Sequence, residues 1–196
     1  LPSFAGLLLE YELGGLERLL VDPAHPVVAV IGGKKIESKL PVIEHISKTA
    51  DAVCLGNILA NEVKSKKVKF TNSSKIFMPL DGIPGQGREF DIGPKTKALY
   101  VKILKNAKTV FWAGPLGKYE DARYEEGSLA VAKAIIKSNA YSIAGGGNLL
   151  AFLGKHRLRE KFSHLSTGGS AMLAFLAGKK LPGLQALGYY GKKNLS

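Results

Sequence analysis

The sequence predicts an open parallel α/β sheet flanked by helices, and three observations support this fold class. Short, mostly apolar runs rich in β-forming residues alternate with longer helical stretches along the 196 residues. The short runs are apolar throughout, which is typical of strands buried on both faces of a parallel sheet. Glycine clusters follow several of these runs and precede helices. Repeated strand, loop and helix therefore favour a parallel sheet with right-handed crossovers.

Each expected element has a local pattern behind it. The short apolar runs predict strands at Val27–Ile31, Ala52–Gly56, Lys75–Met78, Thr109–Ala113 and Tyr141–Ala144. The stretches with a helical apolar period predict helices at Ser3–Leu20, Ile36–Lys48, Pro94–Asn106, Glu126–Ser138, Asn148–Leu153 and Gly169–Ala177. Asn139 is a suitable C-terminal stop for the Glu126 helix. The Gly- and Pro-rich segment Pro79–Gly93 predicts a long loop, and Cys54 and Trp112 are expected in the core.

The composition narrows the class of partner. A formal net charge of +12 and a pI near 9.7 fit a nucleic acid, a smaller polyanion such as a nucleotide, or a basic solvated surface. The basic residues lie in dispersed groups without regularly spaced aromatic residues, which argues against nucleic acid. A single cysteine excludes an internal disulfide and suits the reducing cytoplasm. No apolar run approaches the roughly 20 residues of a membrane span, so we expect a cytoplasmic protein without a membrane partner.

Glycine clusters mark a candidate ligand site. Gly32 and Gly33, Gly114 to Gly117, and Gly145 to Gly147 each follow an expected strand, and Ser166 to Gly169 opens a helix. In parallel sheets ligands bind beyond the carboxyl ends of strands, and helix N-termini attract phosphate. One cluster could serve a turn alone, but four together favour a phosphate-bearing ligand. The two hydroxyl groups of the fourth cluster are expected to cap its helix.

Lysines accompany the first glycine pair. Lys35 and Lys39 are four residues apart, so a helix would stack them on one face beside Lys34. A polyphosphate would stabilise these stacked cations, whereas the alternative is a solvated basic face. Neither a P-loop nor a dinucleotide-binding glycine motif is present, because Gly147 to Lys155 has the wrong spacing and no such motif follows the first strand.

Several motifs, in the same order, are similar to segments of one enzyme family. AVIGGKKIESKL resembles GGAKVxDKI, FWAGPLGKYED resembles WNGPxGxFE, and SIAGGGNL resembles GGGD[ST]. HLSTGGSAMLAFLAGKKLPGLQAL resembles H[VI]STGGGAxLExLxGKxLPGxxAL, while FDIGP and SFAGLLLEYEL are weaker matches. The sequence thus resembles phosphoglycerate kinases over about Ser3 to Leu187.

The resemblance implies the C-terminal half of a two-domain glycolytic kinase with a Rossmann-like, three-layer α/β/α fold. That half binds ADP or ATP with Mg²⁺, and the other domain binds 3-phosphoglycerate or 1,3-bisphosphoglycerate. We expect a hinge-proximal helix over residues 1–20, a nucleotide-binding domain over 21–187 and a frayed tail over 188–196. The sequence begins without methionine and enters a helical pattern directly, so an upstream portion is expected. We expect a monomer that transfers no phosphoryl group without the N-terminal domain.

The resemblance also implies roles for individual residues. Lys35 matches the lysine that attends the transferring phosphoryl group, and Lys39 matches a second lysine at the nucleotide phosphates. Gly56 falls near the glycine of the adenine pocket. Pro115 lies beside the nucleotide, and Glu120 matches the glutamate that accepts hydrogen bonds from the ribose hydroxyls.

The implied roles of the glycines concern phosphate. Gly33 belongs to the nucleotide-binding set, and Gly145, Gly146 and Gly147 lie with the following helix N-terminus at the nucleotide phosphates. Gly168 and Gly169 lie at the helix that faces the acyl-phosphate substrate across the cleft. Such an arrangement suits phosphoryl transfer, which depends on positioning and on cations or backbone dipoles aimed at phosphate oxygens.

Five positions depart from the family pattern. Asn148 stands where the family has the aspartate that holds Mg²⁺, and Leu149 replaces a Thr or Ser. Ala113 replaces an asparagine, Lys34 an alanine, and Ser170 a glycine. An amide oxygen can coordinate Mg²⁺ but carries no charge. Two hypotheses follow: a divergent working enzyme in which Lys34 partly replaces the lost metal charge, or a degenerate module that retains the fold.

Overall fold

A six-stranded parallel sheet forms the centre of the molecule in a computed structural model that describes residues 4–85 and 87–191. The strand order is β3-β2-β1-β6-β7-β8, and every neighbouring pair is parallel. The strands are β1 (Val27–Ile31), β2 (Ala52–Leu55), β3 (Ile76–Phe77), β6 (Thr109–Ala113), β7 (Tyr141–Gly145) and β8 (His164–Ser166). The predicted parallel sheet is confirmed.

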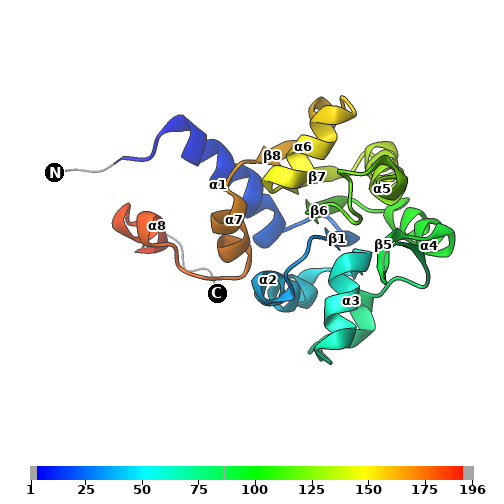
Figure 1. Ribbon diagram of the computed structural model, residues 1–196. Helices are drawn as coiled ribbons and strands as arrows, with labels where there is room; N and C mark the ends of the chain where they lie inside the picture. The colour runs from blue at the N-terminus through cyan, green and yellow to red at the C-terminus, as the bar shows by residue number, and fades with distance from the viewer. Residues whose placement is uncertain (1–3, 86, 192–196) are drawn as a thin grey trace.

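Helices cover both faces of this sheet, which gives three layers (Figure 1). The helices are α1 (Leu7–Leu20), α2 (Ile36–Thr49), α3 (Asn57–Ser65), α4 (Pro94–Leu104), α5 (Glu126–Ser138), α6 (Gly147–Lys155), α7 (Gly169–Leu176) and α8 (Pro182–Ala186). Buried side chains of α1, α2 and α7 join one apolar cluster, and those of α4, α5 and α6 join the other. The three-layer α/β/α architecture is therefore the observed one.

The central strands are apolar because both of their faces are covered. Along β1, Val27, Ala29 and Ile31 pack into the cluster beneath α1 and α2, while Val28 and Val30 pack into the opposite cluster. All five residues are buried. Trp112 and Cys54 are fully buried, as expected. Water is thus excluded from both faces of the sheet, as the unbroken apolar runs indicate.

The prediction of a long loop over Pro79–Gly93 is wrong in part. It contains an antiparallel hairpin of β4 (Gly82–Pro84) and β5 (Glu89–Ile92). These strands are short and only partly buried, and one carries a proline, so they lack the pattern of a core strand. The sequence patterns also give no prediction for helix α3, strand β8 or helix α8, which the structure contains.

The ends of several elements differ from the expected bounds. Helix α1 begins at Leu7, and Ser3 lies outside the described residues. Asn139 has a φ of 55° and ends α5 in the left-handed conformation, as predicted. The prediction of a frayed tail is wrong as far as Gly191. Tyr189–Gly191 forms a short 3-10 turn, and the Tyr190 hydroxyl accepts a hydrogen bond from Leu181 N at 2.9 Å. Residues 192–196 lie outside the described part.

The strand order positions a ligand site. From β1 the chain builds outward through β2 and β3, and it then returns to place β6 on the other side of β1. The loops that follow β1 and β6 therefore leave the sheet in opposite directions. A crevice forms at such a point in open parallel sheets. Among the described residues, no helix has the length and apolar character needed to cross a membrane.

Candidate functional site

A cavity of about 490 Å³ lies at the carboxyl ends of β1, β6 and β7, where the strand order reverses. It brings together residues from five separate segments, each of which follows a different strand of the sheet. The residues expected at the site that line the cavity are Gly33, Lys35, Lys39, Pro115, Glu120, Gly145, Gly146, Gly147, Asn148 and Gly169. The cavity thus collects motifs that are far apart in the sequence.

Two residues expected at the site do not line this cavity. Gly56 lies behind it, where an added Cβ would be 3.0 Å from the Cα of Leu116 and 3.1 Å from the Cα of Gly32. Gly56 therefore allows three backbone segments to pack closely. Gly168 lines a neighbouring apolar groove between α1, α7 and α8, whereas the next residue, Gly169, lines the cavity.

Glycines bring the loops after β1 and β6 into direct contact. The backbone N–H of Gly33 donates to the carbonyl oxygen of Pro115 at 3.1 Å, and a side chain at Gly32 would collide with that carbonyl. Gly33 itself has a φ of 103°, which L side chains rarely adopt. The glycine pair after β1 is thus required by this close approach, and it holds Lys34 and Lys35 beside the β6 loop.

The N-terminus of α6 opens directly into the cavity. Its N-cap is Gly146, with φ 98° and ψ 134°, and no side chain caps it in the described part of the chain. Gly147 and Asn148, the first two residues of the helix, line the cavity. The uncapped first-turn N–H groups and the positive end of the helix dipole therefore favour an anion there.

The expected capping of α7 by the hydroxyl groups of Ser166 and Thr167 is wrong, because the N-cap is Gly168 and no side chain of the described residues caps the helix. Ser166 Oγ accepts from Gly168 N at 3.3 Å, which precedes the first helical turn. Instead, the backbone N–H and the hydroxyl of Thr167 both donate to Oε1 of Glu12, at 2.7 and 2.9 Å. Burial acts to raise the pKa of Glu12, but hydrogen bonds from Ser166 and Thr167 outweigh it and lower that pKa. This contact fastens α1 to the turn between β8 and α7.

The lysines of the cavity pair with no carboxylate in the described part of the chain. Within the described residues, no carboxylate oxygen lies within 4.0 Å of the ammonium nitrogens of Lys34, Lys35 or Lys39. The nearby acids Glu37 and Glu62 pair with Lys66. Lys39 is half-buried, and this burial lowers the pKa of its ammonium group.

The expected helical stacking of Lys35 on Lys39 differs in detail. Lys35 is the N-cap of α2, with φ −116° and ψ 107°, so it precedes the first helical turn. Ser38 Oγ donates to the carbonyl oxygen of Lys35 at 2.9 Å and holds this bend. Both ammonium groups still belong to one cavity wall.

The oxygen donors of the cavity are a poor fit for Mg²⁺. Asn148 is exposed and offers one neutral amide oxygen, and Glu120 alone of the described lining residues carries a carboxylate. In residues 4–85 and 87–191, no three His, Cys, Asp or Glu side chains are grouped as a metal site would require. Because Mg²⁺ in proteins is held mainly by carboxylates and phosphates, the described lining of this cavity offers the ion few ligands of its own.

Some lining residues were not expected from the sequence. They are Ser38, Ile58, Tyr119, Met172 and Leu173. Ile58 lies in the first turn of α3, and Met172 and Leu173 lie in α7, so apolar side chains reach the cavity from two helices. In the sequence these residues are marked only by their position soon after a strand end or a glycine cluster. Core residues occur at the same positions, so this signal does not distinguish a lining residue from a core residue.

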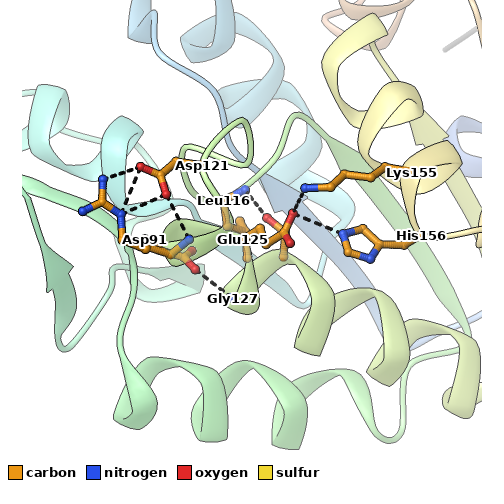
Figure 2. A network of polar contacts seen from close by, with 9 residues as sticks. Asp91, Leu116, Asp121, Glu125, Gly127, Lys155 and His156 are labelled. Atoms are coloured by element: carbon orange, nitrogen blue, oxygen red, sulfur yellow. Dashed lines mark hydrogen bonds and ion pairs between the residues drawn. The ribbon is translucent and has the colours of Figure 1, made fainter.

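Polar contacts at the N-terminus of α5 join it to β5 and to the loop after β6 (Figure 2). The Ser128 hydroxyl accepts from Leu116 N at 2.9 Å, which fixes the loop after β6. The carboxylate of Asp91 accepts from Gly127 N at 2.7 Å and from Ile92 N at 2.8 Å. Burial raises the pKa of Asp91 to about 6, although both hydrogen bonds act to lower it.

A second contact in Figure 2 joins α5 to the end of α6. Glu125 Oε2 accepts from Lys155 Nζ at 2.6 Å and lies 3.2 Å from His156 Nε2. The hydrogen bond from Lys155 is the main cause of the lowered pKa of Glu125. Because α6 begins at the cavity, this contact helps to orient the helix whose N-terminus faces the ligand space.

The fold and the cavity define a Rossmann-like parallel α/β protein with a cation-lined site at the carboxyl edge of its sheet. A family model described as phosphoglycerate kinase matches residues 1–69 and 57–179. The chain belongs to the phosphoglycerate kinase family.

Relatives and solved structures agree with this assignment. The chain is 35% identical to phosphoglycerate kinases of Leptospira biflexa and Herpetosiphon aurantiacus, with 95% of the chain and 58% of each relative covered. The Coxiella burnetii phosphoglycerate kinase structure matches with a TM-score of 0.82 at 32% identity, covering 94% of this chain and 58% of that one. The Pyrococcus horikoshii structure matches with a TM-score of 0.83 at 28% identity, covering 98% and 59%. The chain therefore corresponds to part of a phosphoglycerate kinase.

Proposed function

We propose that this chain is the ADP- or ATP-binding half of a phosphoglycerate kinase. The complete enzyme would transfer a phosphoryl group reversibly between 1,3-bisphosphoglycerate and ADP in glycolysis, giving 3-phosphoglycerate and ATP. The observation that carries the proposal is the single cavity that collects Lys35, Lys39, Glu120 and the Gly145–Gly147 turn. These residues come from separate strand ends. Together they supply the cations and backbone N–H groups that would bind the phosphates of a nucleotide and the carboxylate that would bind its ribose.

In this proposal the nucleotide phosphates lie between two walls of the cavity. Lys35 and Lys39 bind phosphate oxygens from the side of α2, and the first N–H groups of α6 bind them from the other side. Glu120 is exposed at the cavity and would accept hydrogen bonds from the ribose hydroxyls. Ile58 offers the base an apolar contact, and Gly56 acts indirectly by allowing the loops behind it to pack.

The transferring group would lie between Lys35 and the first turn of α7. Gly169 lines the cavity there with Ser170, and α7 has no side-chain cap within the described residues. A cation and a helix N-terminus would stabilise the charge that spreads over the phosphoryl oxygens during transfer. The acceptor or donor acid would come from the other domain, which would close the cavity from the opposite side.

The apolar side of α1 is our proposed contact for the remaining domain. Phe4 and Leu7 are 86% and 85% exposed, and Leu8 is 65% exposed, beside the N-terminal end of this helix. Without that domain the cleft stays open to water, so we expect this chain alone to bind nucleotide without transferring phosphate. We further propose a monomeric, cytoplasmic enzyme.

A nucleotide-binding module that has lost catalysis is the second candidate. Leu149 is fully buried and Asn148 carries no charge, so the start of α6 lacks the hydroxyl and carboxylate of the family pattern. The activity of a two-domain protein that joins this chain to an N-terminal domain separates the candidates. Measurable turnover supports the enzyme, whereas turnover that appears only after Asn148→Asp supports the lost-function module.

Thermal unfolding tests the nucleotide site itself. ADP at about 100 times its Kd should stabilise the chain by about 2.7 kcal/mol, and it should do so in Mg²⁺ buffer, in EDTA buffer, or in both. Lys35→Ala and Glu120→Ala should reduce the shift. Lys133→Ala is the matched control, because Lys133 is exposed on α5 and does not line the cavity. A chain that shows no shift with millimolar ADP in either buffer contradicts the proposal.

A further inference from the structure

The charge of the cavity is strongly one-sided. Lys34, Lys35 and Lys39 line it with three ammonium groups, against the single carboxylate of Glu120 among the described lining residues. These ammonium groups have no carboxylate partner within 4.0 Å in that part of the chain. Lys39 is also half-buried. Lys34 and Lys35 are exposed, so Lys39 is the cation of the three that is partly removed from water. Three cations without a carboxylate partner in the described residues favour the ligand with the most negative charge.

A second cavity extends this positive surface. It has a volume of about 440 Å³, shares Lys34 and Lys35 with the main cavity, and is lined by Arg88 on the hairpin side. The carboxylate of Glu62 also lines it, but one oxygen accepts from Ile36 N at 2.7 Å and lies 3.9 Å from Lys66 Nζ. Glu62 is therefore already engaged in the start of α2. Lys34 therefore lines both cavities, as Lys35 does.

The start of α6 lacks the carboxylate that would favour a metal-bound phosphate. Asn148 gives an uncharged oxygen at the position where the family motif has aspartate, and the next residue, Leu149, is fully buried. The substitution at Lys34 has the opposite sign, since it adds a cation where the motif has alanine. Both changes lie on the lining of the same cavity, and both shift its charge in the positive direction.

We propose that this cavity binds the nucleotide diphosphate preferentially in its metal-free form, with Lys34 supplying positive charge that Mg²⁺ would otherwise supply. The inference rests on the proposed nucleotide site. Mg²⁺ removes about two negative charges from the diphosphate and needs oxygen ligands. In this chain it would therefore weaken the attraction to the lysines without gaining a carboxylate ligand. Added Mg²⁺ should compete with binding.

Calorimetric titration of the full chain with ADP tests this, once in EDTA and once in excess Mg²⁺. We expect the wild-type Kd in EDTA to be at least about threefold lower than the Kd in Mg²⁺, because two charges separate the ligands in a partly screened cavity. Lys34→Ala should weaken metal-free binding about tenfold, which is the effect of one charge-assisted hydrogen bond. It should change binding of the magnesium complex less.

Asn148→Asp is the reverse test. It adds a carboxylate at the start of α6 and should invert the preference, so that ADP binds more tightly in Mg²⁺ than in EDTA. Lys133→Ala and Asn106→Asp are matched controls, since they make the same charge changes at exposed positions away from the cavity. Neither control should alter the ratio of the two Kd values.

The outcomes separate the two proposals. The inference is supported if the wild-type chain binds ADP in both buffers with a lower Kd in EDTA. Lys34→Ala should then abolish this preference for metal-free ADP, and Asn148→Asp should invert it. Wild-type chain that binds ADP only in Mg²⁺, or more tightly in Mg²⁺, overturns the inference and leaves the nucleotide site intact. An absence of ADP binding in either buffer overturns both.

Discussion

The ligand cavity and the junction between the β4–β5 hairpin and α5 both hold charged side chains away from water, but these charges find partners in different places. Asp91 is fully buried, and its carboxylate accepts backbone hydrogen bonds from Ile92 and Gly127. Lys39 is half-buried in the cavity, and no carboxylate of the described residues lies within salt-bridge distance.

This difference distinguishes a structural charge from a binding charge. A buried group that is hydrogen-bonded within the protein contributes to folding, because its loss leaves donors without an acceptor. A partly buried group without a protein partner costs folding free energy, which a ligand of opposite charge can recover on binding. The first kind of residue should govern unfolding, and the second should govern affinity.

Asp91→Ala should have the largest effect on stability. Two buried backbone N–H groups lose their acceptor, so the free energy of unfolding should fall by about 3 kcal/mol. Denaturant unfolding measures this change. Asp22→Ala is the control, because Asp22 is exposed and a change there should stay within about 0.5 kcal/mol. Equal effects of the two substitutions would contradict a structural role for Asp91.

Lys39→Met should separate affinity from stability. It removes one cation from the cavity, and we expect ADP affinity to fall about 100-fold, or about 2.7 kcal/mol. Stability should rise by about 0.5 kcal/mol because a half-buried charge is replaced by an apolar group of similar length. Calorimetry and thermal unfolding measure the two quantities, with Lys133→Met as the exposed control. A destabilised variant with unchanged affinity would reverse our assignment of Lys39.

The pH dependence of unfolding should report on Asp91. Burial raises the folded-state pKa of Asp91 from 3.8 to about 6, so the folded state binds the proton more tightly than the unfolded state. The stability linked to this proton is therefore present below about pH 4 and is lost as the pH rises through about 6. Relative to Asp91→Asn, the wild type should lose about 2 kcal/mol between pH 4.5 and pH 7. A difference that stays constant with pH would show that Asp91 does not titrate in this range.

The smallest expected effect on stability comes from substitutions at two adjacent glycines, which serve as controls for each other. Gly146 and Gly147 both line the cavity, and an added Cβ would meet no atom within 4 Å at either position. Gly146 has a φ of 98°, whereas Gly147 begins α6 without a positive φ. We therefore expect Gly146→Ala to destabilise the chain by about 1 kcal/mol and Gly147→Ala to change stability by less than about 0.5 kcal/mol. Similar thermal midpoints for both variants would indicate that the bend at Gly146 is not strained by a side chain.

The sequence alone determined the parts of the molecule that depend on local patterns. The bounds of β1, β6 and α5 agree with the expected ranges, because their burial appears directly as apolar runs or as a helical period. Asn139 likewise ends α5 where its tolerance of positive φ allows it. Gly32 after β1 marks the cavity because the backbone of Pro115 approaches it closely, whereas Gly146 after β7 marks it through its positive φ.

Tertiary structure decided what depends on contacts between distant residues. Thr167 caps no helix because Glu12, 155 positions earlier, accepts both of its hydrogen bonds. Gly56 lies behind the cavity because Leu116 packs against it, and Gly168 faces the groove beside α1. A local sequence pattern shows which conformations a residue tolerates, but it cannot show which distant backbone or carboxylate will meet it when the sheet closes.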